Sequence, residues 1–327
     1  MSNVMGEETA ARDKAAGRPE GVVRKGLLES IFDSDVWHSF KRSKITIVAA
    51  VVTFLIFFSA LFAPLIAPQN PFDPANLSLI DSLIPPVWEE GGDSRFLLGT
   101  DDQGRGILST LLYGSRISLA VGFASVIFAA ILGISLGLLA GYAGGRTDAI
   151  IMRIADIQLT FPAILIALLI DGSIRGALGG INREQSAFYV LVFSIGLSFW
   201  VQYARTVRSS TLVEKNKEYV QAARLIGLHP IKIMVRHVLP NVMGPVLVIA
   251  TINLALAIIT EATLSFLGVG IPPTQPSLGT MIRIGNDFLF SGEWWITMFP
   301  GVMLALLVLA VNLLGDWLRD ALNPRLR

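Results

Sequence analysis

The segment Glu218–Pro240 reads EYVQAARLIGLHPIKIMVRHVLP and lies between two long apolar segments of the chain. Its apolar residues recur at intervals of three and four, and Gly227 and Pro230 interrupt the pattern. Residues at this spacing share one face of a helix, so the segment predicts two short amphipathic helices. A folded loop between two apolar segments indicates a membrane protein with a structured connection on one side of the bilayer.

The first predicted helix has signals at both ends. Asn216 can cap it, and Glu218 then lies in the first turn, where the positive end of the helix dipole stabilises a carboxylate. Gly227 can end it, because glycine adopts the left-handed backbone conformation at little cost. One apolar face is predicted, made by Tyr219, Ala222, Ala223 and Ile226.

The second predicted helix begins at Pro230, which suits a first turn because its missing N–H needs no partner there. Pro240 is predicted to end this helix before the next apolar segment. His229 is expected to act as a helix cap and His237 as a packing residue. The predicted apolar face contains Ile231, Met234, Val235 and Val238.

An apolar face on a short helix outside the membrane needs a partner, and two partners are open. The loop can fold against the helices of its own chain, or the first helix can fit a groove on another protein. Ala222 and Ala223 would let a second backbone approach closely.

This segment resembles the coupling loop of ABC importer permeases, in which Glu-Ala-Ala is followed after three residues by Gly and later by Leu-Pro. The spacing matches here, while Gln221 replaces the usual Glu and His237 replaces the usual Ile. A match over so long a spacing is specific. The resemblance implies that nine residues couple the chain to a cytoplasmic ATPase: Glu218, Tyr219, Gln221, Ala222, Ala223, Ile226, Gly227, Leu239 and Pro240.

The composition places the chain in the membrane class. Of its 327 residues, 53% are hydrophobic and 16% are charged, and the mean hydropathy is +0.61, which is too apolar for a soluble domain. The net charge is only +1, so nothing favours nucleic acid as a partner. The lack of cysteine excludes disulfides and thiolate metal sites, and the three His residues have no metal-ligand spacing.

Six segments are long and apolar enough to cross a bilayer core of about 30 Å. The predicted fold is therefore an all-α membrane protein with six transmembrane helices. Residues 1–30 are predicted to be a disordered tail, residues 31–44 an interfacial helix, and residues 45–327 the transmembrane domain. The spans are Ile45–Ala67, Ile117–Tyr142, Ile150–Ile170, Phe188–Val207, Val242–Leu267 and Trp294–Leu314.

The distribution of Lys and Arg predicts that both termini lie in the cytoplasm. With the N-terminus inside, 20 of the 26 Lys and Arg residues fall in the inner segments and 6 in the outer loops. An excess of these residues marks the cytoplasmic side. Residues 208–241 are then a cytoplasmic loop, and residues 68–116 are a long outer loop.

The outer loop ends in an apolar stripe at helical spacing. The stripe predicts either a helix lying on the membrane surface or a platform for an external partner. The stripe contains Ile107, Leu108, Leu111 and Leu112.

The outer loop and two later segments share a further resemblance. The flanking Leu98–Asp101 and Gly114–Arg116, together with Glu261–Gly268 and Asn312–Asp320, resemble dipeptide and oligopeptide permease subunits. The chain is therefore identified as similar to the C-type subunit of the dipeptide, oligopeptide and nickel permease family. This resemblance implies the architecture of a type I ABC importer permease.

Three residues are predicted to line the translocation path. An ionisable group within a span is costly and usually faces a cavity or a partner, which singles out Glu261. Its position near the outer end of the fifth span also fits a carboxylate exposed to water. Asn253 in the same span and Gly279 in the last outer loop complete the set.

Two further features of the spans are interpreted as structural. Asp156 is predicted to pair with Arg153, about one helical turn away. The second span carries small residues four apart, which predicts close packing against another helix. These are Ala129, Gly133, Gly137 and Gly141.

Two functions from different classes remain open. The first is a permease subunit of a bacterial ABC importer in the cytoplasmic (inner) membrane, for di- or oligopeptides or similar solutes. The resemblance implies a second permease subunit, two cytoplasmic ATPase subunits and an external solute-binding protein as partners. The second function is an ion-coupled secondary transporter or channel acting alone.

The chain itself is not expected to be an enzyme or to hold a cofactor. It has no Gly-Lys dipeptide, and therefore no phosphate-binding loop of the Gly-x-x-x-x-Gly-Lys-Ser/Thr type. ATP and Mg are expected in the partner ATPase subunits.

Overall fold

The computed structural model describes residues 40–73, 77–177 and 183–321. The chain divides into two compact units, Met1–Ser43 and Lys44–Arg327. The predicted tail of residues 1–30 and most of the predicted interfacial helix of residues 31–44 lie outside the described residues. The spans, the loops and both sites lie in the second unit.

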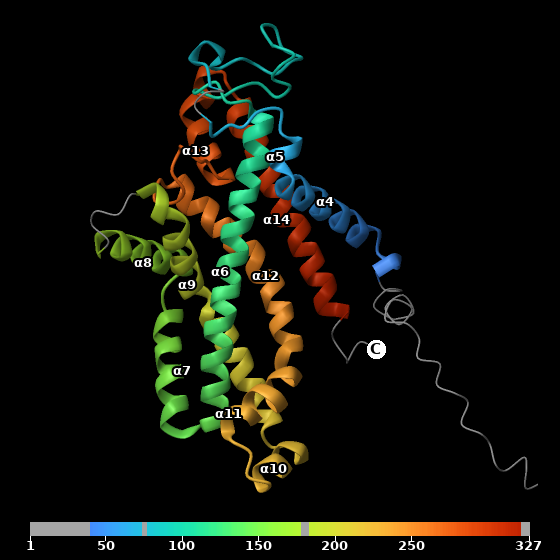
Figure 1. The fold of residues 1–327 in the computed structure, drawn as a ribbon, viewed down its shortest axis with the longest axis vertical. Helices are drawn as coiled ribbons and strands as arrows, with labels where there is room; N and C mark the ends of the chain where they lie inside the picture. Colours follow the sequence, from blue (N-terminus) through green and yellow to red (C-terminus); the bar gives the residue numbers. More distant parts are fainter. Residues whose placement is uncertain (1–39, 74–76, 178–182, 322–327) are drawn as a thin grey trace, which may run out of the picture. The chain divides into compact units, whose positions relative to one another are not determined.

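The second unit is built from helices joined by short turns and one long loop (Figure 1). Its described residues contain no β-sheet, and a single β-bridge joins Thr100 to Gly106. Short helical turns are η2 (Leu79–Asp81), the π-helix η3 (Met234–Val238) and η4 (Leu289–Ser291). The α-helices are α4 (Lys44–Leu61), α5 (Ala63–Ile66), α6 (Ile107–Ala143), α7 (Gly145–Leu159), α8 (Ala163–Ala177), α9 (Arg183–Glu214), α10 (Glu218–Leu225), α11 (Pro230–Ile233), α12 (Leu239–Phe266), α13 (Leu278–Phe288) and α14 (Trp295–Ala321).

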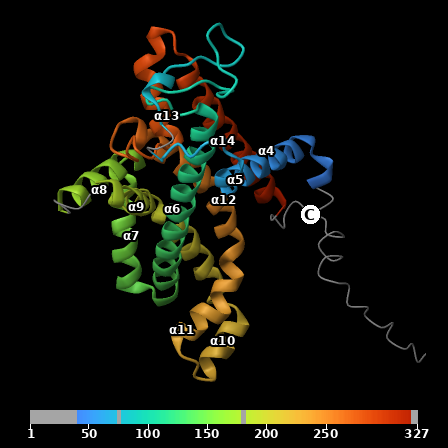
Figure 2. The same ribbon diagram turned by 45° about the horizontal axis from the view of Figure 1, so that its top comes forward.

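Five stretches of helix are long and apolar enough to cross a membrane, and a sixth arises if α7 and α8 together form one span. The five include α4, α6, α14, most of α9, and the continuous stretch Pro230–Phe266. The helices α10 and α11 lie at one end of the unit, and α13 and the long loop lie at the other (Figures 1 and 2). This arrangement confirms the predicted all-α membrane fold.

The third predicted span is not one straight helix. The helices α7 and α8 meet at an angle of 100°, so the prediction of a single helix over Ile150–Ile170 was wrong. Pro162 explains the break, because proline disfavours helical geometry in the preceding Phe161 and lacks an N–H donor. Proline then suits the entry to α8.

The apolar stripe that follows the long loop is not a separate surface helix. Ile107, Leu108, Leu111 and Leu112 form the first turns of α6, which continues without a break for 37 residues. At 1.5 Å per residue this helix is about 55 Å long, far more than a bilayer core of about 30 Å. The helix therefore extends beyond the bilayer core.

The small residues of α6 pack tightly against α9, as predicted. A Cβ atom added to Gly133 would lie 2.4 Å from the Trp200 carbonyl oxygen, and one added to Gly137 would lie 2.5 Å from the Ala204 carbonyl oxygen. The two backbones can approach this closely only because these positions carry no side chain.

Pro240 does not end a helix, which corrects the sequence interpretation. The chain stays helical from Pro230 to Phe266, and Pro240 lies in the first turn of α12. The π-helix η3 immediately precedes it, and the Leu239 N–H donates to the Met234 carbonyl. Proline has no N–H to donate to the preceding turn. The wider π-helical turn lies where the regular α-helical hydrogen bonds would be interrupted, so the helix continues past Pro240.

Candidate functional site

The helix α10 begins near the predicted position but is capped differently. Its N-cap is Lys217, whose side chain makes no capping bond, and Glu218 occupies the first turn as expected. Asn216 was predicted to be the cap. Instead its side-chain Nδ2 donates to the Leu212 carbonyl (3.0 Å), and its own carbonyl accepts from Gln221 Nε2 (3.1 Å).

The end of α10 is set by Gly227, as predicted. Gly227 has a φ of +77°, which is the left-handed conformation that glycine adopts at low cost. The Leu228 N–H donates to the Ala223 carbonyl (3.1 Å), and the Gly227 N–H donates to the Arg224 carbonyl (3.0 Å). These two bonds form a Schellman motif that turns the chain toward α11.

The start of α11 is also fixed by a local cap. The His229 Nδ1 atom accepts from the Ile231 N–H at 3.3 Å, and Pro230 occupies the first turn. Both predictions for this turn are confirmed.

The two faces of α10 differ from the predicted apolar stripe. Val220 and Ala223 are buried against the chain's own core, together with Ile233 and Val238. Of the predicted stripe, Ala223 is buried, whereas Tyr219, Ala222 and Ile226 are exposed. The other side exposes large apolar residues: Tyr219, Leu225, Ile226, Ile231 and Val235.

These exposed residues of α10, α11 and η3 form what we call the α10–α11 face. Leu225 is 89% and Ile226 is 75% exposed. Both lie outside the helices that are long enough to cross a membrane, so lipid does not account for their exposure. Large apolar side chains exposed in this way make the α10–α11 face a candidate interaction site.

Tyr219 ties α10 to the long helices on both sides. Its hydroxyl donates to Glu214 Oε1 at the end of α9 and accepts from Asn241 Nδ2 in α12 (3.1 Å). Partial burial, together with the hydrogen bond to the Glu214 carboxylate, raises the pKa of Tyr219 to about 12. The hydroxyl therefore stays protonated at physiological pH and keeps its role as a donor.

Further contacts hold the connection to α6. Arg224 lies over the Tyr142 ring, 4.7 Å from its centroid, and its Nε donates to the Tyr142 hydroxyl at 3.2 Å. Lys215 Nζ donates to the Gly141 carbonyl at 2.7 Å. The helix α10 and the turn before it are thus bonded to the ends of α6, α9 and α12.

The remaining residues of the predicted coupling set lie around the same end of the unit. Gln221, Ala222 and Pro240 are exposed, and Leu239 is half-buried. The bond between Tyr219 and Asn241 brings α10 next to the Leu239–Pro240 turn. The structure therefore brings the nine predicted residues together. Their role in coupling stays a prediction.

Glu261 is fully buried, at 0% exposure, which overturns the interpretation of a water-exposed carboxylate. Its two oxygens accept hydrogen bonds from Ser118 Oγ in α6 and from Ser265 Oγ in α12, both at 2.7 Å. The same hydroxyls accept from the Leu278 N–H (3.3 Å) and the Ile271 N–H (3.1 Å). One carboxyl group thus joins α6, α12 and the turn that leads into α13.

The other two residues of the predicted path are also buried. Asn253 is fully buried. Gly279 lies where α13 crosses α12, and a Cβ atom there would lie 2.3 Å from the Ala262 carbonyl oxygen. The position of Gly279 is thus explained by helix packing. A role for the three residues in a translocation path stays a prediction.

Sequence reasoning missed several cross-helix partners. Asp156 pairs with Arg205 of α9 rather than with Arg153, and Asp148 pairs with Arg208. One hydroxyl partner of Glu261 was also missed, since Ser118 is 143 positions away in the sequence. No local pattern signals contacts over such separations.

No metal centre is evident in the described part of the chain, where no group of three or more His, Asp or Glu residues is placed to hold an ion. The features described above are an exposed apolar surface on α10 and α11 and closely packed long helices.

Comparisons with known proteins agree with this arrangement. Residues 133–327 match the family model described as binding-protein-dependent transport system inner membrane component, and residues 32–86 match the N-terminal TM domain of oligopeptide transport permease C.

Individual relatives cover most of the chain. It is 41% identical to the di/tripeptide transport system permease protein of Pseudomonas aeruginosa, over 90% of this chain and 92% of that protein. It is 42% identical to the dipeptide transport system permease protein of Escherichia coli K12, over 90% of this chain and 93% of that protein.

A solved structure has a similar fold. An inward-facing form of the MetNI methionine ABC transporter matches with a TM-score of 0.51 and 23% sequence identity, covering 66% of this chain and 98% of that chain. At this identity the likeness concerns the fold alone.

Proposed function

The chain belongs to the family of binding-protein-dependent transport system inner membrane components, and from this premise we propose that it couples ATP hydrolysis in partner chains to the import of small peptides. It is a permease subunit and a multi-pass membrane protein. The names of the relatives from Pseudomonas aeruginosa and Escherichia coli support di- and tripeptides as the cargo.

The partners follow from the same premise. The proposed assembly contains a second permease chain, two cytoplasmic ATPase subunits that bind ATP and Mg, and an external solute-binding protein. The family description and the relatives support the bacterial inner membrane as the location.

The main evidence for coupling is the α10–α11 face. Leu225 and Ile226 are large, apolar and mostly exposed on a helix that is hydrogen-bonded to the ends of α9 and α12. A groove on an ATPase subunit that buries these side chains would move α10 when the ATPases close. Because α10 is fastened to the spans, the motion would shift the equilibrium between inward-open and outward-open states.

The proposal can be tested by purification and reconstitution. The tagged chain, isolated from its native membrane, is expected to retain ATP-hydrolysing subunits and a second permease chain. In liposomes, the complex with its binding protein is expected to take up dialanine only when ATP is supplied on the cytoplasmic side. Uptake by this chain alone, driven by an ion gradient without ATP, would instead support the ion-coupled transporter.

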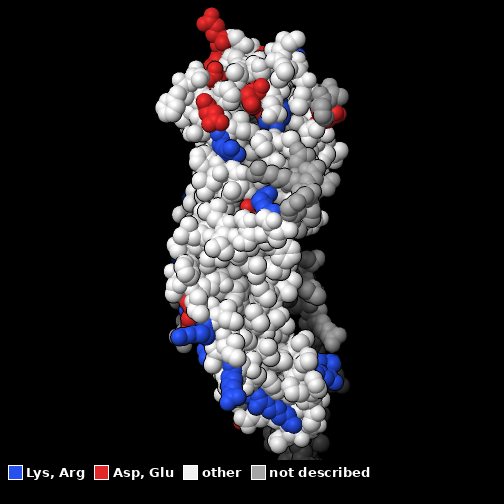
Figure 3. Space-filling view, turned by 90° about the vertical axis from the view of Figure 1, so that its left-hand side faces the viewer, with Lys and Arg blue, Asp and Glu red and all other residues white. Residues whose placement is uncertain are grey.

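The proposed orientation gives a separate prediction. Figure 3 shows a broad band without charged side chains between two charged ends, as expected for a segment inside a bilayer. In this cysteine-free chain, Glu90→Cys in the long loop is expected to react with a membrane-impermeant maleimide from outside. Arg146→Cys at the exposed start of α7 should react only after the membrane is opened. Reversed labelling of the two positions would overturn the predicted inside location of the termini.

A further inference from the structure

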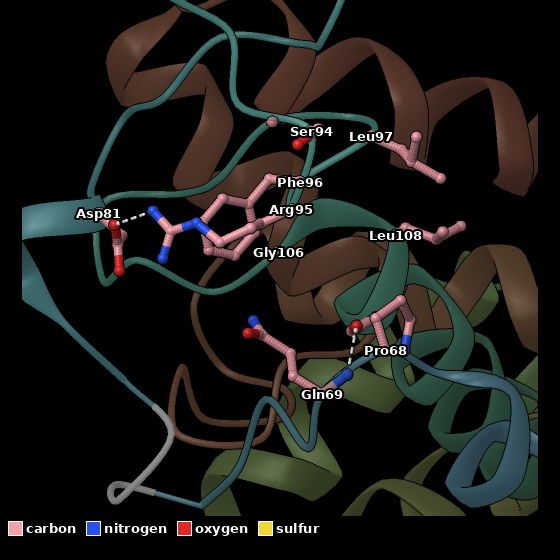
Figure 4. A pocket seen from close by; sticks show the side chains of 11 residues that line it. Pro68, Gln69, Asp81, Ser94, Arg95, Phe96, Leu97, Gly106 and Leu108 are labelled. Carbon is pink, nitrogen blue, oxygen red and sulfur yellow. Dashed lines mark hydrogen bonds and ion pairs between the residues drawn. The ribbon is translucent and has the colours of Figure 1, made fainter.

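A second site lies at the opposite end of the unit, in the long loop before α6. A cavity of about 470 Å³ lies there beside the first turn of α6 (Figure 4). Cavities of 300–1,000 Å³ have the size of small-ligand sites. The coupling proposal makes no use of this cavity.

The walls of this cavity are held in place by buried polar contacts. The Thr100 hydroxyl donates to the Asp81 carbonyl (2.7 Å), and the Ile84 N–H donates to Thr100 Oγ1 (2.8 Å). Trp295 Nε1 donates to the Thr100 carbonyl at 3.0 Å and anchors the loop to α14. A site with walls fixed in this way is formed before any ligand arrives, which reduces the entropy lost on binding.

One donor in this cavity has no acceptor. The Gln69 Nε2 atom is buried, and no acceptor lies within hydrogen-bond distance among the described residues. Figure 4 shows the Gln69 side chain extending into the space below Arg95. The Gln69 backbone is held separately, because its N–H donates to Ser109 Oγ (3.3 Å). A buried donor without a partner costs free energy. A ligand that supplies an acceptor to Gln69 Nε2 would remove this cost.

The charges around the cavity decide what kind of acceptor fits. Arg95 is paired with two carboxylates, since its Nη2 lies 2.8 Å from Asp81 Oδ1 and its Nε lies 2.9 Å from Asp93 Oδ2. The hydrogen bonds from Arg95 hold the pKa of Asp93 below its usual range, so Asp93 is ionised at neutral pH. Two carboxylates around one guanidinium disfavour an anionic ligand and favour a neutral acceptor such as an amide carbonyl.

The rest of the lining combines the hydroxyls of Ser94 and Ser109 with apolar side chains, and the cavity is partly open to solvent. Phe96 and Leu108 line the cavity, and Leu97, which is 51% exposed, lies at its edge. An amide carbonyl beside an apolar side chain is the repeating chemistry of a peptide. We propose that this cavity is a peptide-binding subsite, in which Gln69 Nε2 donates to a ligand carbonyl and Leu97 packs on an apolar side chain.

This inference rests on the proposed function, because a peptide reaches the loop only if the loop faces the outer compartment. The proposed ligand is a free peptide. Contact of the outer loop with the external binding protein could cover the same region without using Gln69, and the experiment separates the two cases.

The test uses the assembled complex in nanodiscs and a single cysteine as the probe. Leu97→Cys at the edge of the cavity is labelled with a maleimide, and Glu90→Cys in the same loop but outside the cavity is the matched control. Labelling rates are measured with leucyl-leucine alone and with the purified binding protein alone. Each measurement is repeated after Gln69→Met, which keeps the size of the side chain and removes its donor.

Leucyl-leucine alone is expected to slow labelling at position 97 and not at position 90. Gln69→Met should raise the leucyl-leucine concentration needed for half-maximal protection about three- to tenfold, the equivalent of one neutral hydrogen bond. Protection only by the binding protein would show contact of the loop with that protein and would overturn the inference. A lack of protection at position 97, or an unchanged result after Gln69→Met, would overturn it as well. Failure of the proposed function would appear separately, as loss of ATP-dependent uptake by the unmodified complex.

Discussion

Ile226→Asp is expected to detach the ATPase subunits while leaving the permease folded in the membrane. Ile226 is 75% exposed and lies one residue before the glycine that ends α10. A carboxylate there would have to lose its water on entering an apolar groove. Loss of a central interface contact costs about 2 kcal/mol or more, which weakens the association about 30-fold. Co-purification of the ATPases and ATP-dependent uptake are the measurements.

The matched control is Ile80→Asp, the same change at an exposed isoleucine in the long loop at the other end of the unit. It should leave the ATPase subunits bound to the permease. The buried Ala223 is unsuitable for this test, because a larger side chain there would disturb the chain's own core. If Ile226→Asp retains its ATPases and transports normally, the α10–α11 face is not the coupling surface.

Gly279→Ala is expected to lower the thermal stability of the subunit strongly, although alanine is the better helix former. The added Cβ would lie 2.3 Å from the Ala262 carbonyl oxygen and 2.5 Å from its Cα. These are backbone atoms, so α12 and α13 would have to separate. Overpacking of this kind costs about 1–3 kcal/mol, and it would also strain the neighbouring hydrogen bonds of Glu261. Thermal unfolding of the purified complex in detergent measures the effect.

Gly301→Ala in α14 is the control, since no atom lies within 4 Å of the added Cβ. There the helix propensity of alanine should act alone and stabilise the helix by up to about 1 kcal/mol. The same substitution is therefore expected to shift the unfolding temperature in opposite directions at the two positions. A Gly279→Ala subunit as stable as the unmodified one would show that the crossing can relax without cost.

The end of α10 and the start of α11 could be predicted from the sequence because they depend on neighbouring residues. Gly227 and His229 act on backbone groups within five positions, and both behave as their chemistry requires. The orientation of α10 could not be predicted in the same way. Helical periodicity tells which residues share a face, and only the surrounding fold decides that Val220 and Ala223 point inward.

The polar contacts within the spans could not be predicted from the sequence, because the partners lie on different helices. Glu261 was recognisable as a costly residue in an apolar segment, but its partner Ser118 belongs to another helix. Asp156 had a basic residue at suitable spacing in its own helix, and Arg205 of α9 is its partner instead. The break at Pro162 did carry a local signal, because proline disfavours helix in the residue before it.

The pairing of α7 with α9 has a consequence for the order of events during biosynthesis. Asp148 and Asp156 leave the ribosome 60 and 49 residues before the arginines that neutralise them. At about 5–20 residues per second, α7 waits roughly 2–12 s with both carboxylates unpaired. Water can hydrate the Asp156 carboxylate during this interval, since its side chain is 55% exposed even in the completed fold. We therefore expect the ion pairs between α7 and α9 to form only after both segments have been synthesised.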